Sequence, residues 1–477
     1  MTLLFKRQAL TGFAAACLLP LAQLATAESL LDIYELALEN DAQLKAQAAQ
    51  YLANTEQENI ARSALLPQVS AGYGVTGNKT ETTSQQILGF DPTGTPVVGE
   101  GFNKNDTETT GWDVSLSQTL FDLSSWYTFK AGEEFTKQAE ADFAANTQNL
   151  IVRVVEAYFG VLRAQDNLSA AEAQEKAFER QLEQTTQRFE VGLIAITDVY
   201  EAEAARDLAQ VQRIVEENNV DVAKERLSVL TGQSHGDLFQ LSEEFTAKPP
   251  TPTDRSSWVE FALENNYRLA AARYAEESAR QAAKANKMEH APTVTATYQY
   301  ADNDTDGTRA ANPEPIFLVQ PDSQQTREVW QVRVDMPLFS GGRISASRRQ
   351  AAQQYIAARE NRVNLMRTTV TEARSLHMTV LSDVARVAAR KQSIKSSQSA
   401  LDATEAGYEV GTRNIVDVLN SQNVLFSAER DYANSRYDFI INTLRLKENA
   451  GTLSPEDVGR LDSFLEQPAP ATASGSR

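Results

Sequence analysis

Residues 112–121 read WDVSLSQTLF, and residues 330–339 read WQVRVDMPLF. In both stretches apolar side chains alternate with polar ones, a pattern that predicts a strand with one apolar and one polar face. Three further pairs of segments match in the same order: 37–40 with 262–265, 189–192 with 408–411, and 231–232 with 450–451. The offsets of all four pairs lie between 218 and 225 residues. Such collinear matches at a nearly constant offset indicate a tandem duplication.

The amino-terminal residues predict export from the cytoplasm. Lys6 and Arg7 precede an apolar stretch, and Ala25-Thr26-Ala27 fits a signal-peptidase site, so residues 1–27 are expected to be a signal peptide. Cleavage before Cys17, as in a lipoprotein, is the alternative, but it would leave an unusually apolar mature start. Because Cys17 is the only cysteine, the chain can form no internal disulfide.

The rest of the chain divides into two repeats, residues 28–248 and 249–464, followed by residues 465–477, whose Pro, Ala and Ser predict a disordered tail. Each repeat is expected to contain a helix, a strand, a long loop, a second strand and a very long pair of helices. Apolar residues recur along the first long helix at coiled-coil spacing. Gly192 is expected to end that helix, and Thr197 to cap the one that returns. A compact helical bundle is the alternative, although helices this long are rare in one.

The strands determine the predicted fold class. Each repeat contains two alternating strands of about ten residues, the length and pattern of a membrane barrel strand. A sheet in lipid cannot keep an open edge, and four strands are too few to close a barrel. We therefore predict a mainly helical chain with long coiled-coil helices, in which four strands from each of three copies complete a 12-stranded outer-membrane barrel.

Three segments resemble the TolC family of outer-membrane channel-tunnels: RQLEQTTQRFEVGLIAITDV at 180–199, SALDATEAGYEVGTRNIVDVL at 399–419, and residues 449–453. The resemblance covers the mature chain except its tail. It implies a homotrimer in the cell outer membrane that extends into the periplasm as a helical tunnel and serves as the exit duct of tripartite efflux pumps, of type I protein secretion, or of both. It also implies contact with outer-membrane lipid, a periplasmic adaptor (membrane fusion) protein and an inner-membrane transporter of the RND, ABC or MFS type.

The resemblance also implies a gated entrance at the two helix–turn–helix tips. Polar contacts between the tips would hold the resting entrance shut, and the turns at Gly192 and Gly411 would dock the adaptor. Asp417 would face the pore in an acidic ring, whereas Asn420 stands where the family has a second aspartate. The implied gate residues are Thr197, Asp198, Tyr408, Arg413, Asp417 and Asn420. The plainer alternative is that the two aspartates are favourable acids at helix starts.

Composition and motifs favour few other functions. A formal charge of −19 leaves no basic excess for a nucleic-acid partner. The sequence contains no phosphate-binding loop, nucleophile elbow or zinc-binding helix motif, so we expect neither an enzyme nor a cofactor or metal site. A periplasmic coiled-coil adaptor is the alternative function, but an adaptor should have one helical hairpin flanked by compact β domains.

One acidic segment, Asp302-Asn303-Asp304-Thr305-Asp306-Gly307, resembles the first half of a calcium-binding loop. The position of the last ligand in such a loop would be Pro313, which has no side-chain oxygen. A polar external loop between two strands explains the segment equally well, so the sequence leaves calcium binding open.

Overall fold

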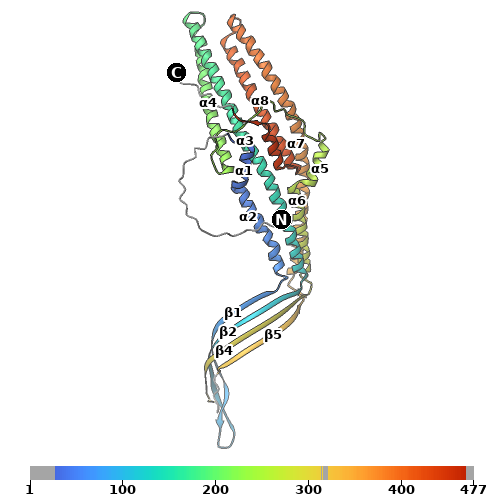
Figure 1. The fold of residues 1–477 in the computed structure, drawn as a ribbon. Coiled ribbons are helices and arrows are strands. Elements are labelled where there is room, and N and C mark those ends of the chain that lie inside the picture. The colour runs from blue at the N-terminus through green and yellow to red at the C-terminus, as the bar shows by residue number, and fades with distance from the viewer. Residues whose placement is uncertain (1–26, 313, 315–320, 469–477) are drawn as a thin grey trace, which may run out of the picture.

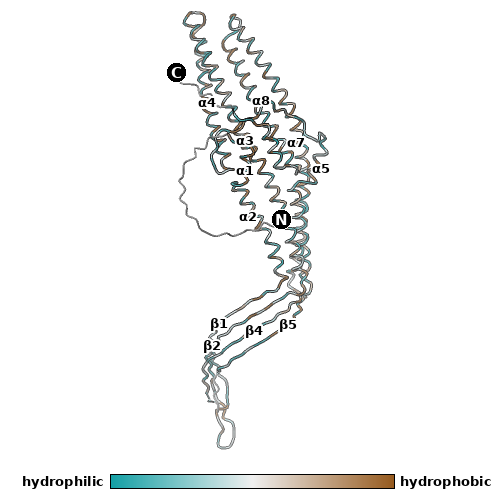
Figure 2. The backbone as a smooth tube through the Cα atoms, in the orientation of Figure 1, coloured by the Kyte–Doolittle hydropathy of each residue, from teal (hydrophilic) through white to brown (hydrophobic). Residues whose placement is uncertain are grey.

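The computed structural model describes residues 27–312, 314 and 321–468. Long helices form one end of the molecule and a four-stranded sheet forms the other (Figure 1). The predicted signal peptide up to residue 26 and residues 469–477 of the predicted tail lie outside the described residues. Figure 2 shows hydrophilic and hydrophobic residues interspersed along the long helices, and no described helix combines the length and apolar character needed to cross a membrane.

The order of elements repeats along the chain. The first repeat contains α1 (Leu30–Asn40), α2 (Ala42–Ser63), β1 (Gln68–Phe90), β2 (Pro96–Phe121), α3 (Leu123–Glu190) and α4 (Ile196–Thr231). The second contains α5 (Arg255–Asn265), α6 (Tyr267–Met288), β4 (Thr293–Asn312), β5 (Ser323–Asp335), α7 (Arg343–Glu409) and α8 (Ile415–Asn449). The remaining elements are β3 (Gln240–Leu241), α9 (Pro455–Asp462) and β6 (Leu465–Glu466).

The two longest helices are α3 and α7, with 68 and 67 residues. At about 1.5 Å per residue each is on the order of 100 Å long. The carboxylate of Asp122 caps α3 by accepting hydrogen bonds from the backbone N–H groups of Ser124 and Ser125, at 2.8 and 3.2 Å. Because α3 then runs without a break to Glu190, the sequence prediction of a single long helix is confirmed.

A short break divides the first helical segment of each repeat, so the prediction of one helix there is wrong. Asp41 follows α1 and caps α2 by accepting a hydrogen bond from the N–H of Leu44, and it pairs with Arg153 at 2.8 Å. In the second repeat Asn266 caps α6 in the same way, through the N–H of Leu269 at 2.9 Å. The helix breaks because these side chains, buried between helices, satisfy the first N–H groups of the next helix.

The four strands form one antiparallel sheet in the order β1-β2-β4-β5. β1 and β2 contain 23 and 26 residues and are joined by a tight turn at 91–95, where Gly94 has a φ of +85°. The expected long loop between them is therefore wrong. The polar segments continue the ladder because their Thr residues favour strands and Lys79 pairs with Asp106 across it at 2.7 Å.

The acidic segment 302–307 lies inside β4 rather than in a loop. In an extended strand, alternate residues such as Asp302, Asp304 and Asp306 are spaced about 7 Å apart along one face. Calcium ligands must all lie 2.3–2.6 Å from one ion. The three carboxylates therefore cannot converge on one ion from this strand.

The main buried cluster lies in the middle of the molecule, where α1, α3, α8 and the small β3–β6 sheet meet. Tyr158 and Phe159 of α3 are fully buried there, and the Tyr158 hydroxyl donates a hydrogen bond to the carbonyl of Phe239 at 2.8 Å. The predicted disordered tail begins too early, because Leu465 and Glu466 form β6 and Leu465 is buried. This core holds α3 and α7 near their middle and α4 and α8 near their carboxyl-terminal ends, and it leaves the tips of both hairpins to form the site.

Candidate functional site at the helical tips

Two helical hairpins, α3–α4 and α7–α8, end at the same end of the molecule, opposite the sheet (Figure 1). Gly192 and Gly411 sit in the two turns with φ values of +75° and +78°. The N–H of Gly192 donates to the carbonyl of Phe189 at 2.8 Å, and that of Gly411 donates to Tyr408 at 3.1 Å. The repeated sequence at 189–192 and 408–411 thus encodes the same turn twice, and glycine suits it because a Cβ disfavours this backbone region.

The helices that return from the turns start differently. Asn414 caps α8: its side chain accepts from the N–H of Asp417 at 2.8 Å, and the Asp417 carboxylate accepts from the N–H of Asn414 at 3.4 Å. α4 starts after Ala195 without a side-chain cap. The predicted cap at Thr197 is therefore wrong, because Ala195 occupies the extended capping position and Thr197 already lies inside the helix, where its hydroxyl donates to Asp198 at 3.4 Å.

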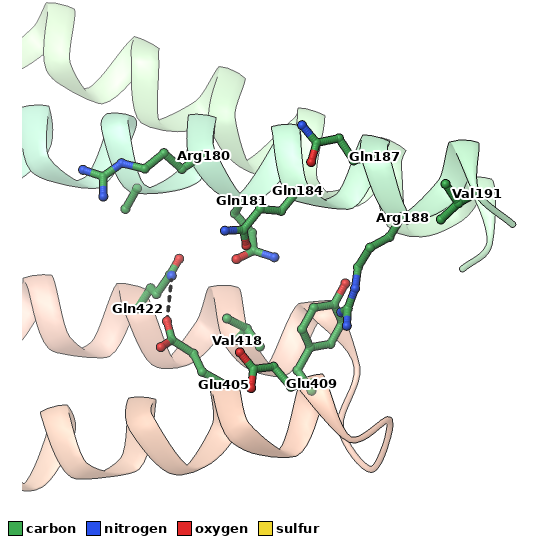
Figure 3. Close-up of a pocket in the computed structure, with 12 residues that line it drawn as sticks. Arg180, Gln181, Gln184, Gln187, Arg188, Val191, Glu405, Glu409, Val418 and Gln422 are labelled. Atoms are coloured by element: carbon green, nitrogen blue, oxygen red, sulfur yellow. Dashed lines mark hydrogen bonds between the residues drawn. The ribbon is translucent and has the colours of Figure 1, made fainter. Parts of the chain in front are cut away.

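A groove of about 670 Å³ lies between the two hairpins near their tips (Figure 3). Arg180 and Arg188 project into it from α3, opposite Glu405 and Glu409 of α7. The guanidinium of Arg188 lies over the ring of Tyr408, 4.9 Å from its centroid. Cation–π contacts of this kind contribute about 0.5–2 kcal/mol, so this pair ties the first hairpin to the second.

Three buried polar atoms around the groove have no hydrogen-bond partner among the described residues: Nε2 of Gln181, the hydroxyl of Tyr408, and Oε1 of Gln422. The other end of the Gln422 amide donates to Glu405 at 3.4 Å (Figure 3). An unpaired buried polar group costs about 1–3 kcal/mol. The groove of a single chain is therefore suited to accept further hydrogen-bonding groups.

The implied gate residues lie at both tips, but one chain does not bring them all together. Arg413 Nη1 lies 3.8 Å from the carboxylate of Asp417 on its own hairpin, and Thr197 bonds its neighbour Asp198. Tyr408 packs beneath Arg188 on two apolar clusters, one within the second hairpin and one that also contains Phe178 and Ala209 of the first. Asn420 is exposed on α8, one turn beyond the half-exposed Asp417.

Sequence reasoning missed Gln181, Arg188, Glu405 and Gln422, which line the groove. A signal was present, because Gln181 and Arg188 are seven residues apart and thus follow the heptad spacing of the helix. Polar residues at such seam positions specify how helices pair. The heptad spacing does not show which helix these residues face. Only the fold shows that.

A model of the family described as outer membrane efflux protein matches residues 33–233 and 258–452. The chain is 35% identical over 458 residues to the outer membrane protein TolC of Vibrio cholerae, covering 95% of this chain and 98% of that protein. It is 30% identical over 454 residues to the alkaline protease secretion protein AprF of Pseudomonas aeruginosa, covering 95% and 90%. The crystal structure of the outer membrane protein VceC of Vibrio cholerae shares the fold, with a TM-score of 0.71 at 19% identity over 88% of this chain and 96% of that one.

Proposed function

Since this chain belongs to the outer membrane efflux protein family and is a TolC-type channel of the outer membrane rather than an enzyme, we propose that three copies close into one continuous duct. The duct runs from an entrance at the helical tips to an exit at the sheet. It serves efflux, type I protein secretion, or both, and energy is supplied by an inner-membrane transporter of the RND, ABC or MFS type.

The open edges of the sheet support closure with further copies. Within the described residues β1 pairs only with β2, and β5 pairs only with β4. Unpaired strand edges cost several kcal/mol per backbone group in lipid. Since all strands alternate in direction, β5 of one copy can pair with β1 of the next without breaking the antiparallel order, and three copies give a barrel of the predicted size.

The helical wall has complementary edges as well. In Figure 1, α4 and α7 lie on opposite sides of α3 and α8. α4 carries eight acidic and four basic residues, whereas α7 carries eleven basic and six acidic ones. Exposed apolar residues follow α4 at coiled-coil spacing, namely Leu208, Val211, Val215, Val222 and Val229. An acidic edge with an open apolar seam thus faces the basic edge of the next copy when the ring closes.

The proposed gate consists of contacts between neighbouring tips, with Tyr408 and Arg413 on one side and Thr197 and Asp198 on the other. The unpaired polar atoms in the groove support it, because closure with other copies supplies new partners. Exposed contacts of this kind contribute about 0.2–1 kcal/mol each. Repeated in three chains, they hold the entrance shut while leaving a docked adaptor enough binding energy to open it.

The adaptor is proposed to dock on the two turns. Val191, Leu193 and Val410 flank the glycines of these turns and are between 70% and 74% exposed. Apolar side chains that protrude into water in this way favour a protein partner. The turns are also the part of the described chain farthest from the sheet, so they are the first surface that a periplasmic partner meets (Figure 1).

Single-channel recording tests the gate. We expect Tyr408→Phe combined with Arg413→Ser to raise conductance, because the links between tips are lost. The matched control is Tyr355→Phe with Arg359→Ser, the same residue types on α7 about fifty residues from the tip and outside the groove, which should conduct like the unchanged protein. If the gate variant assembles and conducts like the control, closure does not depend on these residues.

The mass of the detergent-extracted protein tests the assembly and should correspond to three chains. Arg374 and Lys395 are exposed on α7. Changing both to Glu should weaken the trimer, because it places like charge against α4 of the next copy. A particle with the mass of one folded chain would contradict the proposal.

A further inference from the structure

The β1–β2 hairpin continues beyond the four-stranded sheet. In the described part of the chain β2 pairs with β4 from Phe102 onward, whereas β1 and β2 remain paired up to Phe90 and Pro96. Among the described residues, which omit 313 and 315–320 after β4, residues 84–90 and 96–101 form a ribbon of two strands at the end of the molecule farthest from the helical tips (Figure 1). A ribbon of two strands is marginally stable in water unless something packs against it.

The end of this ribbon is apolar and exposed. Ile87, Leu88, Phe90, Val97 and Val98, which we call the apex patch, are each between 44% and 70% exposed. Residues 84–101 contain only two charged side chains, Asp91 and Glu100. The carboxylate of Asp91 is used within the turn, where it accepts hydrogen bonds from the N–H groups of Thr93 and Thr95 at 2.8 and 2.9 Å. The patch therefore combines low charge with an apolar surface that no other described residue covers.

The apex patch has apolar side chains on both faces of the ribbon. Ile87 lies opposite Val98 on one face, and Val97, the neighbour of Val98, points to the other. Leu88 sits at a bulge between Ile87 and Gly89. One flat partner would cover a single face, whereas two neighbours, one on each side, cover both.

Membrane lipid is a poor match for the apex patch. The apolar residues that alternate along β1, which form the row, end at Val75. Residues 76–86 contain no apolar side chain. Val75 and Ile87 are twelve residues apart, which at about 3.3 Å per residue is roughly 40 Å along the strand. With the row in the hydrocarbon layer, about 30 Å thick, the patch lies outside it on the side away from the helices.

We propose that the apex patches of three copies pack together over the outer mouth of the channel and form an apolar cap that narrows the exit. This inference rests on the proposed trimer. A three-fold axis gives each ribbon two identical neighbours, which matches its two apolar faces. Since each ribbon is attached to the sheet at one end only, the three can separate as cargo passes and then close again.

Disulfide cross-linking tests the contact. Cys17 is the only cysteine and lies within the expected signal peptide, so a single new cysteine is informative. Val98→Cys should form covalent dimers when isolated outer membranes are oxidised. Val75→Cys is the matched control, because Val75 and Val98 are both 57% exposed but Val75 lies in the sheet, away from the axis. If Val98→Cys stays monomeric on denaturing gels while the native particle has the mass of three chains, the proposed cap is wrong and the trimer is supported. A native particle with the mass of one chain would instead refute the proposed function.

Conductance provides a second test. In the background of Tyr408→Phe with Arg413→Ser, which is expected to open the entrance, the outer mouth should become limiting. Ile87→Ser with Phe90→Ser should then raise single-channel conductance further, because the apolar contacts of the cap are lost. Thr80→Ser with Thr82→Ser, on the polar part of the same strand, should have no effect. Equal conductance of the apex variant and this control would overturn the cap.

Discussion

The two helical tips have the same turn, but only the second one is firmly anchored. Ile415 and Val418 at the start of α8 are buried. At the start of α4, Ile196 is 40% and Tyr200 is 62% exposed, and the first buried residue is Ala202. The second tip therefore packs into the molecule, Val418 within its own hairpin and Ile415 also against Phe178 and Ala209 of the first, whereas the first tip presents apolar surface outward.

This difference has a consequence for the entrance. A helix start with neither a cap nor buried side chains opens at low free-energy cost, and elements that move are drawn from such regions. The first tip should therefore fray before the second. The contact of Arg188 with Tyr408 then links a loosely held tip to a firmly held one, which suits a latch that must release.

The largest expected effect on stability comes from the glycines that the two turns share. Gly192→Ala and Gly411→Ala should each destabilise the local turn by about 1–2 kcal/mol, because both glycines have a positive φ. Hydrogen exchange of the tip amides measures this. Gly160→Ala is the control: Gly160 lies inside α3 with no heavy atom within 4 Å of an added Cβ, so alanine should stabilise there by up to about 1 kcal/mol. Equal exchange in all three variants would show that the turns do not need glycine.

A smaller effect is expected where the tips differ. Asn414→Ala should destabilise the start of α8 by about 1 kcal/mol, because it removes the side chain that caps the helix. Ala195→Asn should slow exchange of the first amides of α4 by supplying the cap that this helix lacks. If the second variant leaves exchange unchanged, the loose start of α4 must have another cause, such as its exposed apolar residues.

The smallest effect on stability concerns the two aspartates. Asp198 and Asp417 both lie in the first turn of a helix, where a carboxylate contributes about 0.3–1 kcal/mol. Asp417→Asn should cost more than Asp198→Asn, because the Asp417 carboxylate also pairs with Arg413 at 3.8 Å and the amide carries no charge. Thermal unfolding of the two variants measures the difference.

The same pair tests the proposed acidic ring. Asp417→Asn should lower cation-over-anion selectivity in planar bilayers in a salt gradient, because a ring of like charges concentrates counter-ions in the pore. A reversal potential that responds equally to both substitutions would argue against a ring at Asp417 and for a plain role of both acids at helix starts.

The sequence predicts local structure correctly where a single residue type determines the backbone conformation. The repeated glycines at 192 and 411 predicted the turns, and the uninterrupted helix-forming residues predicted α3. The strand prediction stopped too early in β1 and β2, because polar Thr- and Asn-rich segments look like a loop in sequence while pairing across the ladder supports them as strands. The prediction of a cap at Thr197 fails because residue type alone does not reveal that Ala195 has the extended backbone of the capping position.

The sequence by itself determined the duplication, the long helices, the glycine turns and the family resemblance, because each depends on periodicity or on the conformational limits of single residues. Only the tertiary structure decided that Arg188 covers Tyr408, that Gln181 and Gln422 are buried without full partners among the described residues, and that the apex patch extends past the described end of β4. These features arise between segments more than a hundred residues apart or at the unpaired end of a ladder. Their energies depend on which surfaces meet and exclude water, and no local pattern encodes that.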